Sequence, residues 1–197
     1  NRIVLRCSRI TRFKFSLQST RIMLLAIFED DLYKNFLPLT YTRASFELRV
    51  GTHSLLDRIL SWWGDMGDAA LIAREYLSEV LAERFPKKLR EIDKGEDLLL
   101  LNGLCLLEPP GIKEVEALIK EGQPRALIKN QRIVAAFLPR RFIKDDMLKP
   151  PLSIEKIASN LKLSKALRLK LLQYPWELIE HNEEIIAKDV MKLVRYR

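Results

Sequence analysis

The stretch that decides the fold of this chain is Leu37-Pro-Leu-Thr-Tyr-Thr-Arg-Ala-Ser-Phe-Glu-Leu-Arg-Val-Gly51. Ten residues of it hold two threonine hydroxyls and two arginine guanidinium groups, which suit the oxygens of a phosphate or a sugar. They belong to Thr40, Thr42, Arg43 and Arg49. Gly51 then lets the backbone turn before a predicted helix. A loop of this composition can also be an ordinary solvated connection, so its meaning depends on its surroundings.

A buried strand is predicted immediately before this stretch, because residues 24–28 form a continuous apolar run of strand length. Further along, short apolar runs alternate with segments of helical spacing, which is typical of βα units around a largely parallel sheet. The predicted strands are residues 24–28, 69–73 and 97–101. The predicted helices are residues 53–63, 75–84 and 112–121.

The last third of the chain is predicted to contain a hairpin and two long helices. Residues 126–128 and 132–137 flank Asn130-Gln131, which favours a turn between two strands. Residues 153–172 are expected to be mostly helical. A second helix is expected to begin at Tyr174-Pro-Trp-Glu177 and to end near residue 194, because proline suits a first helical turn.

The candidate site is expected among the segments that follow strands, since ligands of open α/β sheets bind outside the carboxyl ends of the strands. Three segments stand out on this ground. They are residues 29–51, residues 102–108 and the loop around residues 139–146.

Five short motifs stand in order between residues 23 and 191. They are Leu37-Pro-Leu-Thr-Tyr-Thr-Arg43, Leu48-Arg-Val-Gly51, Tyr76-Leu-Ser-Glu79, Leu101-Asn-Gly103 and Tyr174-Pro-Trp-Glu-Leu-Ile-Glu-His-Asn182. Together they resemble the sugar nucleotidyltransferase family, in particular the amino-terminal domain of N-acetylglucosamine-1-phosphate uridylyltransferase/glucosamine-1-phosphate acetyltransferase-like proteins. The resemblance implies an α/β fold of three layers, the Rossmann-like nucleotide-diphospho-sugar transferase fold, with a mainly parallel sheet.

The resemblance also implies a reaction, in which a sugar 1-phosphate attacks the α-phosphate of a nucleoside triphosphate and pyrophosphate leaves. Such chemistry needs positioned cations more than covalent help. Arg43 falls where the family has its loop arginine, so it is expected to be the principal phosphate contact and catalytic residue. The residues expected to bind the nucleotide or the substrate are Thr40, Thr42, Arg49, Gly51, Asn102 and Gly103. Mg²⁺ is the expected cofactor of an active enzyme.

Three positions depart from the family pattern. Glu29-Asp-Asp31 replaces a glycine-rich loop after the first strand, and Ala44-Ser45 stands where a lysine is expected. Leu104 replaces an aspartate that binds magnesium. The candidates for a substitute metal ligand are Asp30, Asp31, Glu108, Asp145 and Asp146. The sequence therefore supports substrate binding better than turnover.

Two functions stay open on this evidence. The chain is either a sugar-1-phosphate nucleotidyltransferase or a catalytically degenerate module that binds a nucleotide sugar or acts as a scaffold. In the family, a left-handed β-helix with acyltransferase character follows the Pro-Trp helix, so a β-helix partner or a missing domain of that kind is expected. The base and the sugar are left open.

The net charge of +8 invites a nucleic-acid-binding interpretation. Six of the 34 basic residues and none of the 26 acidic residues lie in residues 1–22, so the rest of the chain carries 28 basic and 26 acidic residues. A dedicated nucleic-acid binder concentrates positive charge on its surface, so nucleic acid is not an expected partner.

Residues 1–22 are interpreted as a basic leader outside the fold, and residues 23–197 as one nucleotidyltransferase-like domain. With 48% apolar residues, such a length can bury one substantial core. No apolar run approaches the roughly 20 residues of a membrane span, so a soluble, cytoplasmic protein without membrane contact is expected. Cys7 and Cys105 have neither metal nor disulfide spacing and are expected to be small buried side chains.

Overall fold

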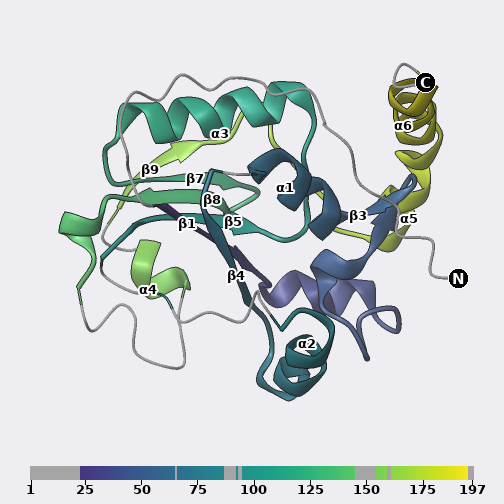
Figure 1. Ribbon diagram of the computed structural model, residues 1–197, viewed down its shortest axis with the longest axis horizontal. Coiled ribbons are helices and arrows are strands. Elements are labelled where there is room, and N and C mark those ends of the chain that lie inside the picture. The colour runs from purple at the N-terminus through teal and green to yellow at the C-terminus, as the bar shows by residue number, and fades with distance from the viewer. Residues whose placement is uncertain are drawn as a thin grey trace, which may run out of the picture.

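A six-stranded sheet runs through the centre of the computed structural model, in the order β4-β1-β5-β8-β7-β9 (Figure 1). Its strands are β1 (Met23–Phe28), β4 (Asp68–Ile72), β5 (Asp97–Asn102), β7 (Arg125–Lys129), β8 (Arg132–Leu138) and β9 (Lys162–Lys165). Among these strands, β8 alone runs opposite to the others, which confirms a mainly parallel sheet. The structure describes residues 23–64, 66–86, 92, 95–144, 154–158 and 161–194. The predicted leader and Cys7 lie outside these residues.

Helices cover both faces of the sheet and give the three predicted layers (Figure 1). Helices α1 (Leu55–Trp63) and α3 (Pro109–Glu121) lie on one face, and the short α4 (Ile154–Ala158) lies on the other. The remaining helices are α2 (Ser78–Arg84), α5 (Pro175–Glu180) and α6 (Asn182–Val194). The shorter elements are η1 (Asp31–Phe36), η2 (Ser45–Glu47), η3 (Glu75–Leu77), η4 (Arg140–Phe142), β2 (Arg49–Val50), β3 (His53–Ser54), β6 (Cys105–Leu106) and β10 (Lys170–Leu171).

The core has two parts, one on each face of the sheet. Strand β1 alternates between them, because Leu25 and Ile27 pack with α1 and α3 while Ala26 and Phe28 pack on the side of α4. A strand that is buried on both faces reads as a continuous apolar run, which is why it can be predicted from the sequence. Cys105 is fully buried, as predicted, and burial raises the pKa of its thiol.

Local signals explain where the covering helices begin and end. The Ser54 hydroxyl accepts a hydrogen bond from the Asp57 N–H (3.0 Å), and the Asp57 carboxylate accepts one from the Ser54 N–H (3.0 Å), which caps α1. Helix α3 begins with Pro109 and ends before Gly122, whose φ of 64° is left-handed. These features fix the layer that covers one face of the sheet.

The prediction of a mostly helical segment at residues 153–172 is wrong. The described part contains only the short α4 before the edge strand β9, which pairs in parallel with β7 from Lys162 onward. Pairing with an existing sheet edge outweighs the weak helical preference of this short segment. The long helix predicted after Tyr174 is confirmed, with a break at His181 between α5 and α6.

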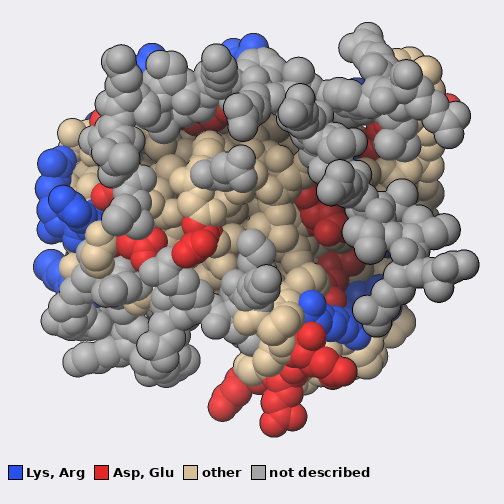
Figure 2. Space-filling model, viewed as in Figure 1, with Lys and Arg blue, Asp and Glu red and all other residues tan. Residues whose placement is uncertain are grey.

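Charged side chains are not uniformly spread over the surface. Figure 2 shows acidic side chains gathered over α2 at the bottom of the view and basic side chains at the left edge, near η4. Three exposed basic residues, Arg140, Arg141 and Lys144, lie in η4 or just after it. Among the described residues, no helix is long and apolar enough to cross a membrane.

Candidate functional site

Three strands end next to one another at the carboxyl edge of the sheet. Phe28, the last residue of β1, pairs with Ile72 of β4 and with Asn102 of β5. The Gly103 N–H donates to Phe28 O (2.8 Å), and a Cβ at Gly103 would lie 2.7 Å from Phe46 Cβ, so glycine permits this close approach. The predicted segments after β1 and β5 therefore begin at the same edge, where ligands of such sheets bind.

The third predicted segment, after β8, begins at the opposite edge. Because β8 is antiparallel to β5, its last residue, Leu138, pairs with Leu98 near the start of β5. The expectation that this loop joins the site is therefore wrong for residues 139–144. Asp145 and Asp146, two of the candidate metal ligands, lie outside the described residues.

A buried ion pair joins the segments that follow β1 and β4. The Arg74 Nε donates to Glu29 Oε1 (2.7 Å), and the two side chains are 13% and 1% exposed. The other oxygen of Glu29 accepts a hydrogen bond from the Ser45 N–H (2.6 Å). Burial raises the pKa of the Glu29 carboxyl above its usual value, although Ser45 and Arg74 act in the opposite direction. The acidic residue after β1 thus holds the loop around Arg43.

The loop that carries Arg43 presents most of its side chains to solvent. Thr42 and Arg43 are exposed, and within the described residues the Arg43 guanidinium has no hydrogen bond or ion pair. Thr40 is fully buried instead, and its hydroxyl donates to Tyr33 O (2.8 Å). Of the binding residues predicted in this loop, two face solvent and the third is already bonded to the protein.

A polar network lies at the end of β1, next to this loop. Asn102 Nδ2 donates to Asp30 Oδ2 (3.0 Å), and Arg132 Nη1 lies 3.4 Å from the same oxygen. The Leu32 N–H donates to Asp30 Oδ1 (3.0 Å), while Asn102 Oδ1 accepts from the Leu104 N–H (2.9 Å). The polar side-chain atoms of Asp30 and Asn102 are therefore bonded to other groups of the protein.

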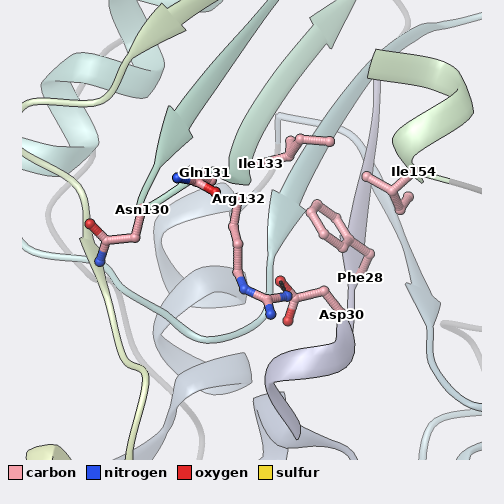
Figure 3. A pocket seen from close by; sticks show the side chains of 7 residues that line it. All are labelled: Phe28, Asp30, Asn130, Gln131, Arg132, Ile133 and Ile154. Atoms are coloured by element: carbon pink, nitrogen blue, oxygen red, sulfur yellow. Dashed lines mark hydrogen bonds and ion pairs between the residues drawn. The ribbon is translucent and has the colours of Figure 1, made fainter. Parts of the chain in front are cut away.

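A pocket of about 290 Å³ opens beside this network (Figure 3). It is lined by Phe28, Asp30, Asn130, Gln131, Arg132, Ile133 and Ile154. Figure 3 shows Arg132 reaching from the start of β8 toward Asp30 at the end of β1. A pocket that combines apolar walls with a few convergent polar groups suits a small ligand such as a sugar or a base.

Arg132 is a residue that the sequence reasoning missed. The hairpin around Asn130 and Gln131 is confirmed, and both turn residues have positive φ, 50° and 62°. The overlooked signal is the direction of β8. Because β8 is antiparallel to β5, it begins at the edge of the sheet where β5 ends. This places the turn and Arg132 at the carboxyl edge of the sheet.

Arg49 and Gly51 lie at a junction with the last helix. The Gly51 N–H donates to Asn182 Oδ1 (2.7 Å), and a Cβ at Gly51 would lie 2.6 Å from Ile185 Cγ2. Arg49 is exposed, and its Nη2 donates to Thr52 O (3.0 Å). Neither residue lines the pocket, and the same is true of Thr40, Thr42 and Arg43.

The three candidate metal ligands that the structure describes, Asp30, Asp31 and Glu108, all pair with basic side chains. Asp31 is 71% exposed and pairs with Lys34 (3.3 Å), while Glu108 pairs with Lys170 (2.6 Å) and Lys188. Burial alone would raise the pKa of Glu108, but the hydrogen bonds from the two lysines outweigh it and lower the pKa. In the part of the chain that the structure describes, no group of three or more His, Cys, Asp or Glu could hold a metal ion. These donors do not fit a protein-held Mg²⁺.

The sequence matches the model of a known protein family. The model of the sugar nucleotidyl transferase family matches residues 25–197. The chain belongs to this family. The match runs from β1 to the end of α6 and beyond, so the resemblance of the five motifs to the sugar nucleotidyltransferase family is confirmed.

Solved structures support the same fold. The crystal structure of a Bacillus anthracis protein, assigned as a glucose-1-phosphate thymidylyltransferase and bound to sucrose, superimposes with a TM-score of 0.54. The match covers 84% of this chain and 95% of that chain at 12% sequence identity, a level at which the likeness supports the fold alone. No curated protein matches this sequence.

Proposed function

We propose that this sugar nucleotidyltransferase-type domain binds a nucleoside triphosphate or a nucleotide sugar, together with a sugar phosphate, at the carboxyl edge of its sheet. Arg43 is the principal phosphate contact. One observation carries the proposal: the guanidinium of Arg43 is exposed and unpaired among the described residues, while buried side chains hold its loop. The loop is tied to Glu29, the neighbour of the pocket residue Asp30.

The proposed reaction is a nucleotidyl transfer. An oxygen of the sugar phosphate forms a bond to the α-phosphorus, the bond from that phosphorus to the bridging oxygen breaks, and pyrophosphate leaves with the electron pair. A phosphate monoester is already an anion near neutral pH, so no residue has to remove a proton from it. Arg43 neutralises charge on the phosphate oxygens, and the pocket beside Arg132 holds the sugar or the base. Mg²⁺ is supplied in the assay together with the nucleotide. None of the described residues is proposed as a ligand of the ion. The cytoplasm, where nucleoside triphosphates are available, is the proposed location.

The test uses the full chain with Mg²⁺, a panel of nucleoside triphosphates and sugar 1-phosphates, and an assay for pyrophosphate. Arg43→Ala is expected to weaken nucleotide binding by at least about tenfold, because a hydrogen bond to a charged group is lost. Arg140→Ala removes the same charge at the opposite edge of the sheet and should leave binding unchanged. Equal effects of the two variants would refute a specific role for Arg43.

The second candidate is a module that binds a nucleotide sugar or acts as a scaffold without turnover, partnered by a left-handed β-helix acyltransferase domain. Two observations favour it. The described residues form no metal-holding cluster, and α5 and α6 expose a strip of apolar side chains. This strip comprises Ile179, Ile186, Val190, Met191 and Val194. Nucleotide-sugar binding that depends on Arg43, without pyrophosphate release from any substrate pair, is the result that selects this candidate.

A further inference from the structure

Arg74 lies at the centre of the contacts that hold the loop of Arg43. Its Nη2 donates to Thr40 O (2.7 Å) and to Arg43 O (3.0 Å). Its Nη1 donates to the Tyr76 hydroxyl (2.7 Å), and its Nε donates to Glu29. One planar group thus joins the segment after β1, the loop and the turn η3, which a point charge such as a lysine ammonium cannot do with the same geometry.

Two tyrosine rings fix the plane of this guanidinium. The Arg74 Cζ lies 3.9 Å from the ring centroid of Tyr33 and 5.0 Å from that of Tyr76. The Tyr76 hydroxyl in turn donates to Tyr41 O (3.0 Å). Together with the two carbonyl contacts of Arg74, this bond ties three carbonyls of the loop to one cluster.

The loop is therefore ordered through its backbone while its side chains stay outside. Ser45 N–H is bound to Glu29 at the far end of the loop, and Tyr41, Thr42 and Arg43 are exposed between the ties. A loop that is ordered before a ligand arrives pays less conformational entropy on binding than a mobile one. The bonds that order the loop come from Glu29, Arg74 and Tyr76, which are not among the predicted binding residues.

We infer that Arg74 is the positioning residue of Arg43: it binds the carbonyl of Arg43 and so fixes where that guanidinium meets a phosphate. The inference rests on the proposed function, because it concerns the same phosphate contact. It assigns to Arg74 no contact with substrate. Its effect on binding must therefore pass through Arg43.

The first test is a double-mutant cycle with inorganic pyrophosphate as the probe, measured by titration calorimetry on the full chain. Arg74→Lys keeps the charge and is expected to weaken binding by roughly tenfold, which corresponds to about 1.4 kcal/mol. In the background of Arg43→Ala, the same substitution should have no further effect. An equal loss in both backgrounds, or no loss in either, would overturn the inference.

The second test reads the loop without any ligand, by hydrogen exchange of the amides of residues 41–45. Arg74→Lys is expected to accelerate this exchange by about tenfold and to leave the core of β1 and β5 unchanged. Arg125→Lys, in the exposed pair with Glu121 at the amino edge, is the matched control and should leave the loop unchanged. Unchanged exchange in Arg74→Lys would also overturn the inference.

These two measurements separate the inference from the function on which it rests. If the wild-type chain binds neither pyrophosphate nor any nucleotide, the proposed function fails, and loop exchange alone decides whether Arg74 orders the loop. Should Arg74→Lys fail to fold, Tyr76→Phe removes only the hydroxyl between Arg74 and Tyr41. It should give smaller changes in the same direction, and an unaltered loop in that variant would count against the inference.

Discussion

The stretch of residues 37–51 has two halves, and a different arginine–carboxylate ion pair holds each of them. In the loop half, residues 37–45, Arg74 and Glu29 are paired to each other and bind backbone groups. The side chain of Arg43 is left exposed. Among the residues that the structure describes, none pairs with this guanidinium, so this half offers a cation to solvent.

The junction half, residues 49–51 with the adjoining Thr52, is held by Arg58 and Asp189, which bond to Val50 O and to Thr52. Arg58 makes a two-pronged contact with Asp189, with distances of 3.0 Å and 2.6 Å. The Thr52 N–H (3.1 Å) and hydroxyl (2.8 Å) donate to the same carboxylate. Every one of these donors is spent on fixing α6 to the body.

The difference shows that an arginine–carboxylate pair can have two effects on the segment it holds. The pair of Arg74 and Glu29 bonds only the backbone of the loop, so a nearby side chain stays available for binding. The pair of Arg58 and Asp189 also bonds the Thr52 hydroxyl, which is then not available. The pKa values of the two carboxyls reflect this. Burial dominates at Glu29 and raises its pKa, whereas at Asp189 the bonds from Arg58 and Thr52 outweigh burial and lower the pKa well below its usual range. In the junction half, the bonds that Asp189 accepts from Arg58 and Thr52 thus decide its pKa, rather than its burial.

The largest expected effect is the loss of stability in Asp189→Ala. The substitution leaves Arg58 buried without its counter-charge and removes the acceptor of Thr52, so the free energy of unfolding should fall by about 3–5 kcal/mol at pH 7. Urea denaturation measures it. Asp31→Ala, which breaks an exposed pair with Lys34, is the control and should cost less than about 1 kcal/mol.

The same variant has a defined pH dependence. Because the pKa of Asp189 is lower in the folded chain than its usual 3.8, its stabilisation is complete above that value and is lost as the pH falls through the lower folded value. The gap between wild type and Asp189→Ala should thus narrow only in strong acid. Glu29 has the opposite sign: its pKa is raised above 4.5, so its contribution to stability falls as the pH rises through the window between 4.5 and the raised value. A gap that closes near neutral pH would contradict this assignment for Asp189.

The second expected effect is steric and concerns Gly51→Ala. A Cβ there would lie 2.6 Å from Ile185 Cγ2 and 2.7 Å from Asp189 Oδ2, and the φ of 68° is itself strained for alanine. Backbone strain of about 1–2 kcal/mol and overpacking of about 1–3 kcal/mol should add to a loss of roughly 3 kcal/mol. Thermal or urea unfolding checks it.

Gly64→Ala separates these two contributions. Gly64 also has a positive φ, 53°, but a Cβ there would meet nothing within 4 Å. It should show the strain without the clash, and its loss should be the smaller of the two. Equal losses would mean that α6 moves to make room and that the junction half is less rigid than its bonds indicate.

The fold was accessible from the sequence wherever burial leaves a simple pattern. Strands β1 and β5 are apolar at consecutive positions because both faces are covered, and the cap Ser54 marks the start of α1. The edge strand β9 was missed because its pairing with β7 is a long-range contact that leaves no local pattern, since Leu163 is exposed. The mainly parallel sheet was therefore predictable from pattern and the family from the resemblance of the five motifs, whereas the segment at residues 153–172 was not predicted.

The candidate site was accessible only in part, for a similar reason. Arg43 was singled out because its loop follows a strand and because the motif around it resembles the family's loop, and its role stays a prediction. Arg74 precedes an ordinary helical pattern, and its importance depends on the pairing of β4 with β1, which brings it to Glu29. The division of the stretch into two halves was equally hidden, because Asp189 lies 137 positions after its partner Thr52.

The smallest expected effect separates two threonines within the loop half. Thr40→Val replaces a buried hydroxyl that donates to Tyr33 O, so it should lower the free energy of unfolding by about 1 kcal/mol. Thr42→Val changes an exposed side chain two positions later and should alter stability by less than about 0.5 kcal/mol. Urea denaturation and calorimetric titration of pyrophosphate measure both variants.

The two variants should rank in the opposite order for pyrophosphate binding, with the larger loss of affinity in Thr42→Val. Thr42→Val should weaken pyrophosphate binding by roughly two- to tenfold if its hydroxyl meets the phosphate beside Arg43, the range that one neutral hydrogen bond gives. Thr40→Val should leave binding almost unchanged. A Thr40→Val variant that kept its stability and lost affinity would show that this hydroxyl leaves Tyr33 for the ligand. The loop half would then rearrange on binding, and its order before binding, on which the role of Arg74 depends, would be incomplete. The two threonine variants, with opposite expected effects on stability and on affinity, therefore test whether the bonds to the loop backbone alone determine which side chains can bind a ligand.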